Sequence, residues 1–111
     1  MSEPGIDEHD WSSEWEDIDS LLTESPTEVL SEADDLVGRM MEARGFALEE
    51  REGEELAEPE TTRSFVEAHR VTEQIDSGDP YYPGDVALAV AAYRELYSFL
   101  LDLGPAAGTP V

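Results

Sequence analysis

Cysteine and lysine are both missing from the 111-residue chain, and it contains no long apolar run. The absence of cysteine excludes a disulfide framework, a zinc or iron–sulfur site held by thiolates, and thiol chemistry. No segment approaches the ~18 consecutive apolar residues of a membrane span. Residues 1–10 are acidic, which does not fit a signal or transit peptide. We therefore expect a cytoplasmic protein that does not bind membranes.

Positive charge is also scarce, because only six arginines offset 28 acidic residues and the net charge is -22. Residues 1–60 hold 21 of the acids, so the acidity is concentrated in the first half of the chain. Direct binding to nucleic acid is disfavoured, because phosphates would be repelled. Genome composition, adaptation to salt, or solvated disordered segments can each explain this acidity. A functional acidic surface is the alternative.

Apolar residues near the N-terminus recur at the spacing of a helix. They occupy positions i, i+4, i+7 and i+11, which places them on one stripe of an amphipathic helix. This stripe predicts a short helix over about residues 11–23, built on Trp11, Trp15, Ile18 and Leu22.

The segment after it has the clearest helix boundaries in the chain. Ser25-Pro26 followed by Glu28 has the pattern of a capping box with proline at the first helical position, and Gly45 follows the last periodic residue. A helix over about residues 26–44 is predicted. Asp34 is placed with the other acids on its polar side.

No segment alternates between apolar and polar residues as a strand would, so an all-α fold is predicted. Short connections favour antiparallel neighbours and therefore an up-and-down bundle. Its main helices are expected over about residues 26–44, 61–77 and 85–103, with the short tryptophan-bearing helix in front.

A single helical domain is predicted over residues 11–104. It contains an acidic loop at residues 47–60, which is unusually long for a compact domain. Residues 1–10 are expected to form a disordered acidic tail, and residues 105–111 a flexible tail of small residues.

Three segments occur in order along the chain: residues 32–46 (EADDLVGRMMEARGF), 65–70 (FVEAHR) and 92–101 (AYRELYSFLL). Together, over about residues 15–101, they resemble a small acidic helical domain found in many actinobacterial proteins of unknown function. Its pattern is roughly EADxLV…MxxRGF, then YRxAH, then YRxLFxxLL. Phe65-Val66-Glu67 and Tyr97 depart from that pattern. The resemblance implies the fold and the type of source organism, and no activity.

Residue patterns of the common catalytic and metal sites do not occur in the sequence. His69 is the only histidine within the predicted fold, and no partner nucleophile is spaced to accompany it. Asp7, Glu8, His9 and Asp10 have the chemistry of metal ligands, but a tail would not hold them in position. We therefore expect neither enzymatic activity nor a bound cofactor or metal.

Seven residues are candidates for binding a protein partner. The tryptophan-bearing helix either closes the bundle or docks into another protein. The tyrosines on the proline-flanked turn are either half-buried or form an aromatic patch. The arginines either pair within the chain, with Glu67, Glu95 or an acid of the second helix, or anchor a carboxylate of the partner. The candidates are Trp11, Trp15, Ile18, Tyr81, Tyr82, Arg70 and Arg94.

The function predicted from these observations is that of a non-enzymatic, acidic helical interaction module, acting as adaptor or regulator of a protein partner. A basic protein is one candidate partner. Two alternatives stay open. One is a nucleic-acid mimic that blocks a basic DNA-binding protein, and the other is a self-associating structural protein such as a homodimer.

Overall fold

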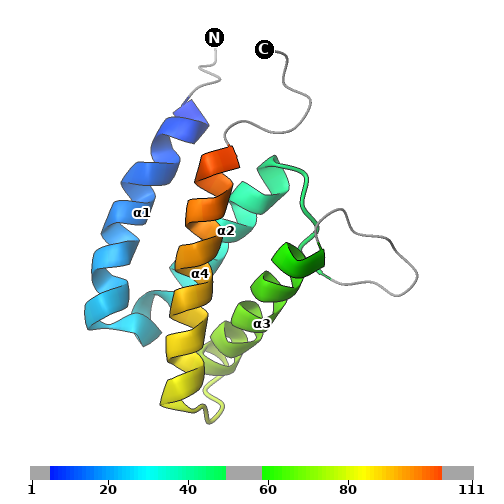
Figure 1. Cartoon of the computed structure of the whole chain (residues 1–111). Helices are drawn as coiled ribbons and strands as arrows, with labels where there is room; N and C mark the ends of the chain where they lie inside the picture. The colour runs from blue at the N-terminus through cyan, green and yellow to red at the C-terminus, as the bar shows by residue number, and fades with distance from the viewer. Residues whose placement is uncertain (1–5, 50–58, 104–111) are drawn as a thin grey trace.

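The computed structural model describes residues 6–49 and 59–103, which form four helices. Figure 1 shows that successive helices run in alternating directions, as in an up-and-down bundle. No strand occurs within these two ranges, so the predicted all-α class is confirmed. The helices are α1 (Ile6–Glu24), α2 (Pro26–Ala43), α3 (Pro59–Asp76) and α4 (Pro83–Leu103).

Helix α2 is the centre of the bundle, because α1, α3 and α4 all pack against it. Its buried positions extend around much of the helix, and several are completely inaccessible to solvent. At Gly38 the ring of Phe65 in α3 lies so close that an added Cβ would meet it at 3.4 Å. The buried set of α2 consists of Val29, Leu30, Ala33, Leu36, Val37, Gly38, Met40 and Met41.

The ends of α2 follow the local sequence closely. Ser25 precedes the helix and Pro26 occupies its first turn, although the Ser25 side chain makes no capping hydrogen bond, so the expected capping box does not form. At the other end Gly45 has φ of 86°, and the N–H of Phe46 donates to the carbonyl of Met41 at 2.8 Å. This Schellman arrangement satisfies carbonyls that the helix end leaves unpaired.

Three helices begin earlier than the sequence predicts. Helix α1 starts at Ile6 rather than at residue 11, because no proline or glycine separates Ile6 from Trp11 and apolar periodicity marks only the packed part of a helix. Helices α3 and α4 start at Pro59 and Pro83, where proline fits the first helical turn. The bundle therefore has four helices of comparable length rather than three with a short addition.

The structure describes only part of the two expected tails and of the expected acidic loop. Residues 6–10 belong to α1 rather than to a disordered tail, and Pro59 and Glu60 of the expected loop are helical. At the start of the expected loop, the carbonyl of Ala47 accepts a hydrogen bond from the Thr62 hydroxyl of α3 at 2.8 Å. Residues 1–5, 50–58 and 104–111 lie outside the described residues.

Candidate functional site

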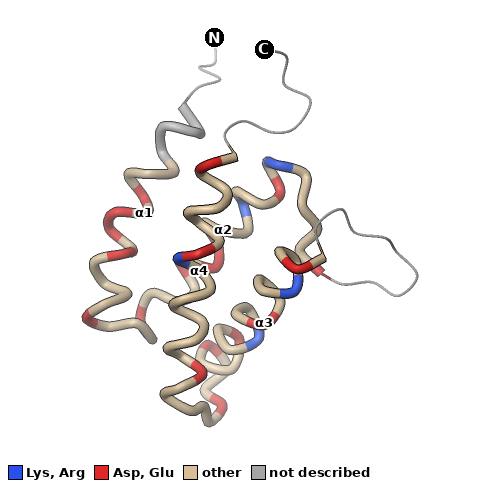
Figure 2. The backbone as a smooth tube through the Cα atoms, viewed as in Figure 1, with Lys and Arg blue, Asp and Glu red and all other residues tan. Residues whose placement is uncertain are grey.

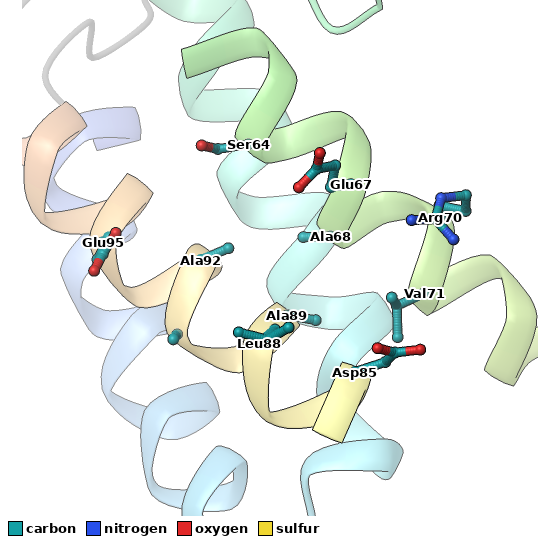
Figure 3. Close-up of a pocket in the computed structure, with 11 residues that line it drawn as sticks. Ser64, Glu67, Ala68, Arg70, Val71, Asp85, Leu88, Ala89, Ala92 and Glu95 are labelled. Atoms are coloured by element: carbon teal, nitrogen blue, oxygen red, sulfur yellow. The ribbon is translucent and has the colours of Figure 1, made fainter. Parts of the chain in front are cut away.

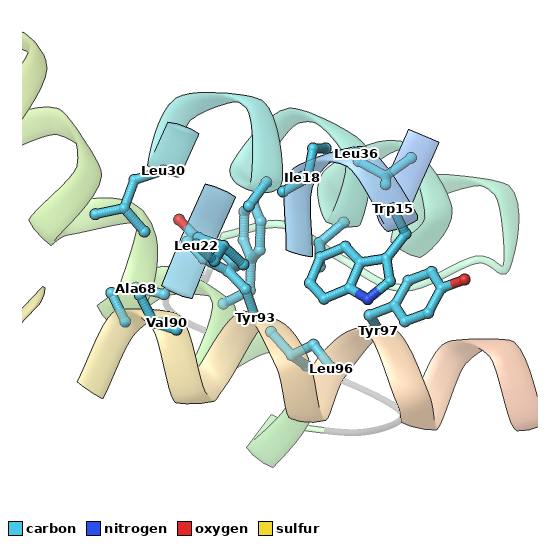
Figure 4. Close-up of a cluster of buried hydrophobic side chains, with 14 of the residues drawn as sticks. Trp15, Ile18, Leu22, Leu30, Leu36, Ala68, Val90, Tyr93, Leu96 and Tyr97 are labelled. Atoms are coloured by element: carbon cyan, nitrogen blue, oxygen red, sulfur yellow. The ribbon is translucent and has the colours of Figure 1, made fainter. Parts of the chain in front are cut away.

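The aromatic residues of α1 lie in the core. Trp15 is 9% exposed, and its ring stacks on Tyr97 of α4 with centroids 4.4 Å apart and an interplanar angle of 9° (Figure 4). Trp11 and Ile18 are also buried, and the guanidinium of Arg39 lies over the Trp11 ring at 5.5 Å. These three residues therefore close the bundle. Their interpretation as docking anchors for a partner is wrong, because the chain itself covers them.

The two candidate arginines differ in their contacts. Arg94 of α4 pairs with Asp19 of α1 at 2.8 Å and also donates to the Thr23 hydroxyl at 2.8 Å. An internal ion pair was predicted for Arg94, but its partner lies on α1 rather than among the expected acids. Arg70 of α3 is exposed and makes no ion pair with the described acids, so the internal pair, one of the two alternatives for this residue, does not form there.

The two tyrosines lie in the connection between α3 and α4. Tyr82 is 76% exposed, which makes the expectation of half-burial wrong for that residue. Tyr81 is exposed as well, but it lines an open apolar hollow with Val86 and Arg94 of α4 and with Leu22 of α1. The alternative that Tyr81 and Tyr82 form an exposed aromatic patch therefore stays a prediction.

A groove that sequence reasoning missed runs between α3 and α4 (Figure 3). Its first part encloses about 320 Å³, with Ala68, Ala89 and Ala92 between the two helices. A second hollow of about 240 Å³ continues it toward the start of α3, and the two share Ser64, Ala92 and Glu95. We call these two adjoining hollows together the α3–α4 groove.

The groove has an apolar ridge on α4 and charged walls. Leu88 on the ridge is 71% exposed, and Phe99 lies farther along the same side of the helix. A helix surrounded by apolar residues is normally covered on all sides. The signal for this surface is present in the sequence, because positions of α4 outside its buried stripe are also apolar. The charged residues lining the groove are Glu60, Glu67, Arg70, Asp85 and Glu95.

A second feature, a polar cluster, joins α2, α3 and α4. Tyr93 of α4 donates its hydroxyl to Asp34 Oδ2 at 2.6 Å, and Nδ1 of His69 lies 2.8 Å from the same oxygen. Thr72 lies 2.7 Å from the Tyr93 hydroxyl, and Nε2 of His69 lies 3.1 Å from Glu73. Asp34 is therefore turned into the bundle, and its predicted position on the polar side of α2 is wrong.

The environment of this cluster raises the pKa of two of its groups, Tyr93 and His69. Burial, and then the negative charge of Asp34, raise the pKa of Tyr93, so the phenol stays a hydrogen-bond donor. Partial burial alone would lower the pKa of His69, but the hydrogen bond and charge of Asp34, helped by Glu73, outweigh it and raise that pKa. Both ring nitrogens of His69 face carboxylates. This arrangement stabilises an imidazolium rather than preparing a general base.

The raised pKa of His69 predicts a pH dependence of stability. Its contribution is fully present below about pH 6.5, the ordinary value for an unfolded histidine, and is lost as pH rises through the higher folded value. Because His69 is partly exposed, we expect the loss to be no more than about 1 kcal/mol. Urea unfolding from pH 5.5 to 8.5 should show this decline in the wild type. In His69→Gln it should be absent, and an identical decline in both proteins would contradict the assignment.

Among the side chains of residues 11–49 and 59–103, no group of three or more His, Asp or Glu is placed to hold a metal ion, and the side chains of Asp7, Glu8, His9 and Asp10 lie outside the described ones. None of the helices in those ranges has both the length and the apolarity to cross a bilayer. Comparison of the chain with protein-family models, with curated proteins and with solved structures gave no match in any of the three. The resemblance drawn from the three sequence segments and the cytoplasmic location therefore stay predictions.

Proposed function

We propose that the chain is a non-enzymatic interaction module that acts as adaptor or regulator by binding another protein in the α3–α4 groove. The observation that carries the proposal is the exposure of Leu88, 71%, on a ridge beside a groove lined by alanines. A leucine side chain exposed to water beside a concave surface with an alanine floor is unfavourable, and a protein partner that covers it would remove this cost.

The polar cluster supports this proposal against catalysis. Asp34, His69, Tyr93 and Thr72 are hydrogen-bonded to one another, and the Tyr93 and Thr72 side chains are buried, so a substrate would not reach their hydroxyls. His69 lines neither part of the groove. The groove itself is lined by carboxylates, one arginine and small apolar side chains, which suit recognition of a surface better than proton transfer.

The nucleic-acid mimic is supported less well. Figure 2 shows acids along the described part of α1, where residues 11–24 contain no basic residue. Two of those acids are already engaged by the chain's own arginines, because Arg39 contacts Glu14 at 2.9 Å and Arg94 contacts Asp19 at 2.8 Å. Internal pairing of this kind reduces the negative potential available to a basic protein.

The proposal is tested by placing a photo-crosslinking amino acid at position 88, and separately at position 21, in the organism that produces the protein. Leu21 of α1 is the matched control, since it is also an exposed leucine and lies outside the groove. We expect discrete adducts with another protein from position 88 and none of the same mass from position 21. Equal adduct patterns, or none from position 88, would reject the groove as a binding surface.

A further inference from the structure

The α3–α4 groove has the length and spacing of a helix-binding site. Leu88, Ala92 and Phe99 are separated by four and seven residues, so they lie on one side of α4 and form a stripe together with Glu95, which falls between Ala92 and Phe99. From Asp85 to Phe99 the lined part of α4 extends about 21 Å at 1.5 Å per residue, which matches about fourteen residues of a second helix. An amphipathic helix laid on this stripe would cover the exposed Leu88.

The floor of the groove allows a second helix to come close. Figure 3 shows Ala68 of α3 and Ala89 and Ala92 of α4 between the two backbones, with Leu88 standing beside them. Methyl side chains leave space into which larger apolar side chains of a partner can insert, as ridges pack into grooves at helix interfaces.

The acidic residues around the groove favour a partner with positive charge. Glu60, Glu67, Asp85 and Glu95 line it, and none of the four makes an ion pair or a side-chain hydrogen bond with the described part of the chain. Arg70 is the single cation among the lining residues. These carboxylates, with Glu95 on the stripe itself and the others beside it, are therefore available to lysine and arginine side chains of a partner.

A second copy of the chain fits this surface poorly. Each copy carries a net charge of -22, and a symmetric contact would bring the same acidic walls together. Arg70 could neutralise one carboxylate of the facing copy, and the others would stay opposed. Like charges placed opposite one another at an interface disfavour that partner.

We infer that the α3–α4 groove binds a basic amphipathic helix of another protein, with the apolar side of that helix on Leu88, Ala92 and Phe99 and its cations against Glu67, Asp85 and Glu95. This inference rests on the proposed function, since it names the class of partner for the same surface.

The test uses three labelled peptides of about fourteen residues, the length set by the groove. The first carries leucines at helical spacing with lysine and arginine elsewhere. The second has the same composition in scrambled order without an apolar face, and the third replaces every cation with glutamate. Fluorescence anisotropy with the full-length protein should show binding of the first peptide about tenfold tighter than the second, a difference typical of one anchoring contact, and no binding of the third.

Two matched pairs of variants locate the binding. Leu88→Gln should weaken the first peptide about tenfold, as loss of an apolar anchor does, while Leu21→Gln should leave it unchanged. Glu67→Gln/Glu95→Gln should weaken binding severalfold. Glu28→Gln/Glu32→Gln removes the same charge from exposed positions on α2 and should have no comparable effect. Because all of these side chains are exposed, we expect every variant to be folded, and circular dichroism checks this.

Each adverse result has a definite meaning. Equal weakening by the two charge pairs would show diffuse attraction and overturn the inference. A dimer seen by sedimentation equilibrium and abolished by Leu88→Gln would assign the groove to a second copy and overturn it as well. Failure of every peptide together with a protein crosslinked at position 88 would reject the basic helix and retain the interaction module. Failure of both experiments would reject both proposals.

Discussion

Trp15→Ala is expected to lower the free energy of unfolding by about 3–5 kcal/mol, the range for truncating a buried large aromatic side chain. The indole is buried and stacked on Tyr97, so its removal leaves a cavity between α1 and α4 and abolishes the ring contact. Adding Trp11→Ala should leave little folded protein, because small domains have total stabilities of about 5–15 kcal/mol. Urea unfolding followed by circular dichroism at 222 nm measures both effects.

Tyr82→Ala is the control for that experiment, since it removes an aromatic side chain that is 76% exposed. Its effect should stay within about 0.5 kcal/mol, as is usual for surface substitutions. If Trp15→Ala and Tyr82→Ala unfold at the same urea concentration, α1 does not contribute its tryptophan to the core. The role of Trp15 as an external anchor would then have to be reconsidered.

Local signals account for the parts of the fold that were predicted correctly. Pro26 and Gly45 bound α2 because proline fits a first helical turn and glycine adopts the positive φ that ends a helix. The stripe of Trp11, Trp15 and Ile18 indicates a helix with one apolar side. It does not indicate what covers that side, because Tyr97, which stacks on Trp15, lies far along the chain.

The contacts that define the candidate site depend on packing between distant segments. Arg94 pairs with Asp19 of α1, 75 residues away, although nearer acids such as Glu95 are available. Asp34 gives a local signal that was overlooked, since it is spaced four residues from Leu30 and three from Val37, on the buried side of α2. The groove also had a signal, the apolar outer positions of α4, but the pairing of α3 with α4 was needed to make it concave.

Asp34→Ala is expected to lower the free energy of unfolding by about 1–3 kcal/mol, the cost of removing the acceptor of a buried donor. Asp34 accepts a hydrogen bond from the hydroxyl of Tyr93, a fully buried residue, and its carboxylate also lies against His69. Its neighbour Asp35 provides the control, because Asp35→Ala removes an exposed ion pair with Arg39 worth about 1 kcal/mol at most. Urea unfolding near pH 6 compares the two substitutions at adjacent positions of α2.

A double-mutant cycle with Tyr93→Phe then shows whether the cluster acts as a unit. In the wild type Tyr93 donates to Asp34, and Thr72 lies close enough to donate to the Tyr93 oxygen in turn. Once Asp34 is gone, removing the hydroxyl should cost less than it does in the wild type, with a coupling of about 0.5–3 kcal/mol. An Asp35→Ala effect as large as that of Asp34→Ala would contradict the special contribution of Asp34. Strictly additive losses would contradict the coupling. Such a result would leave apolar packing as the main contact between α2 and α4, whereas coupling would make Asp34 the polar group that fixes their register.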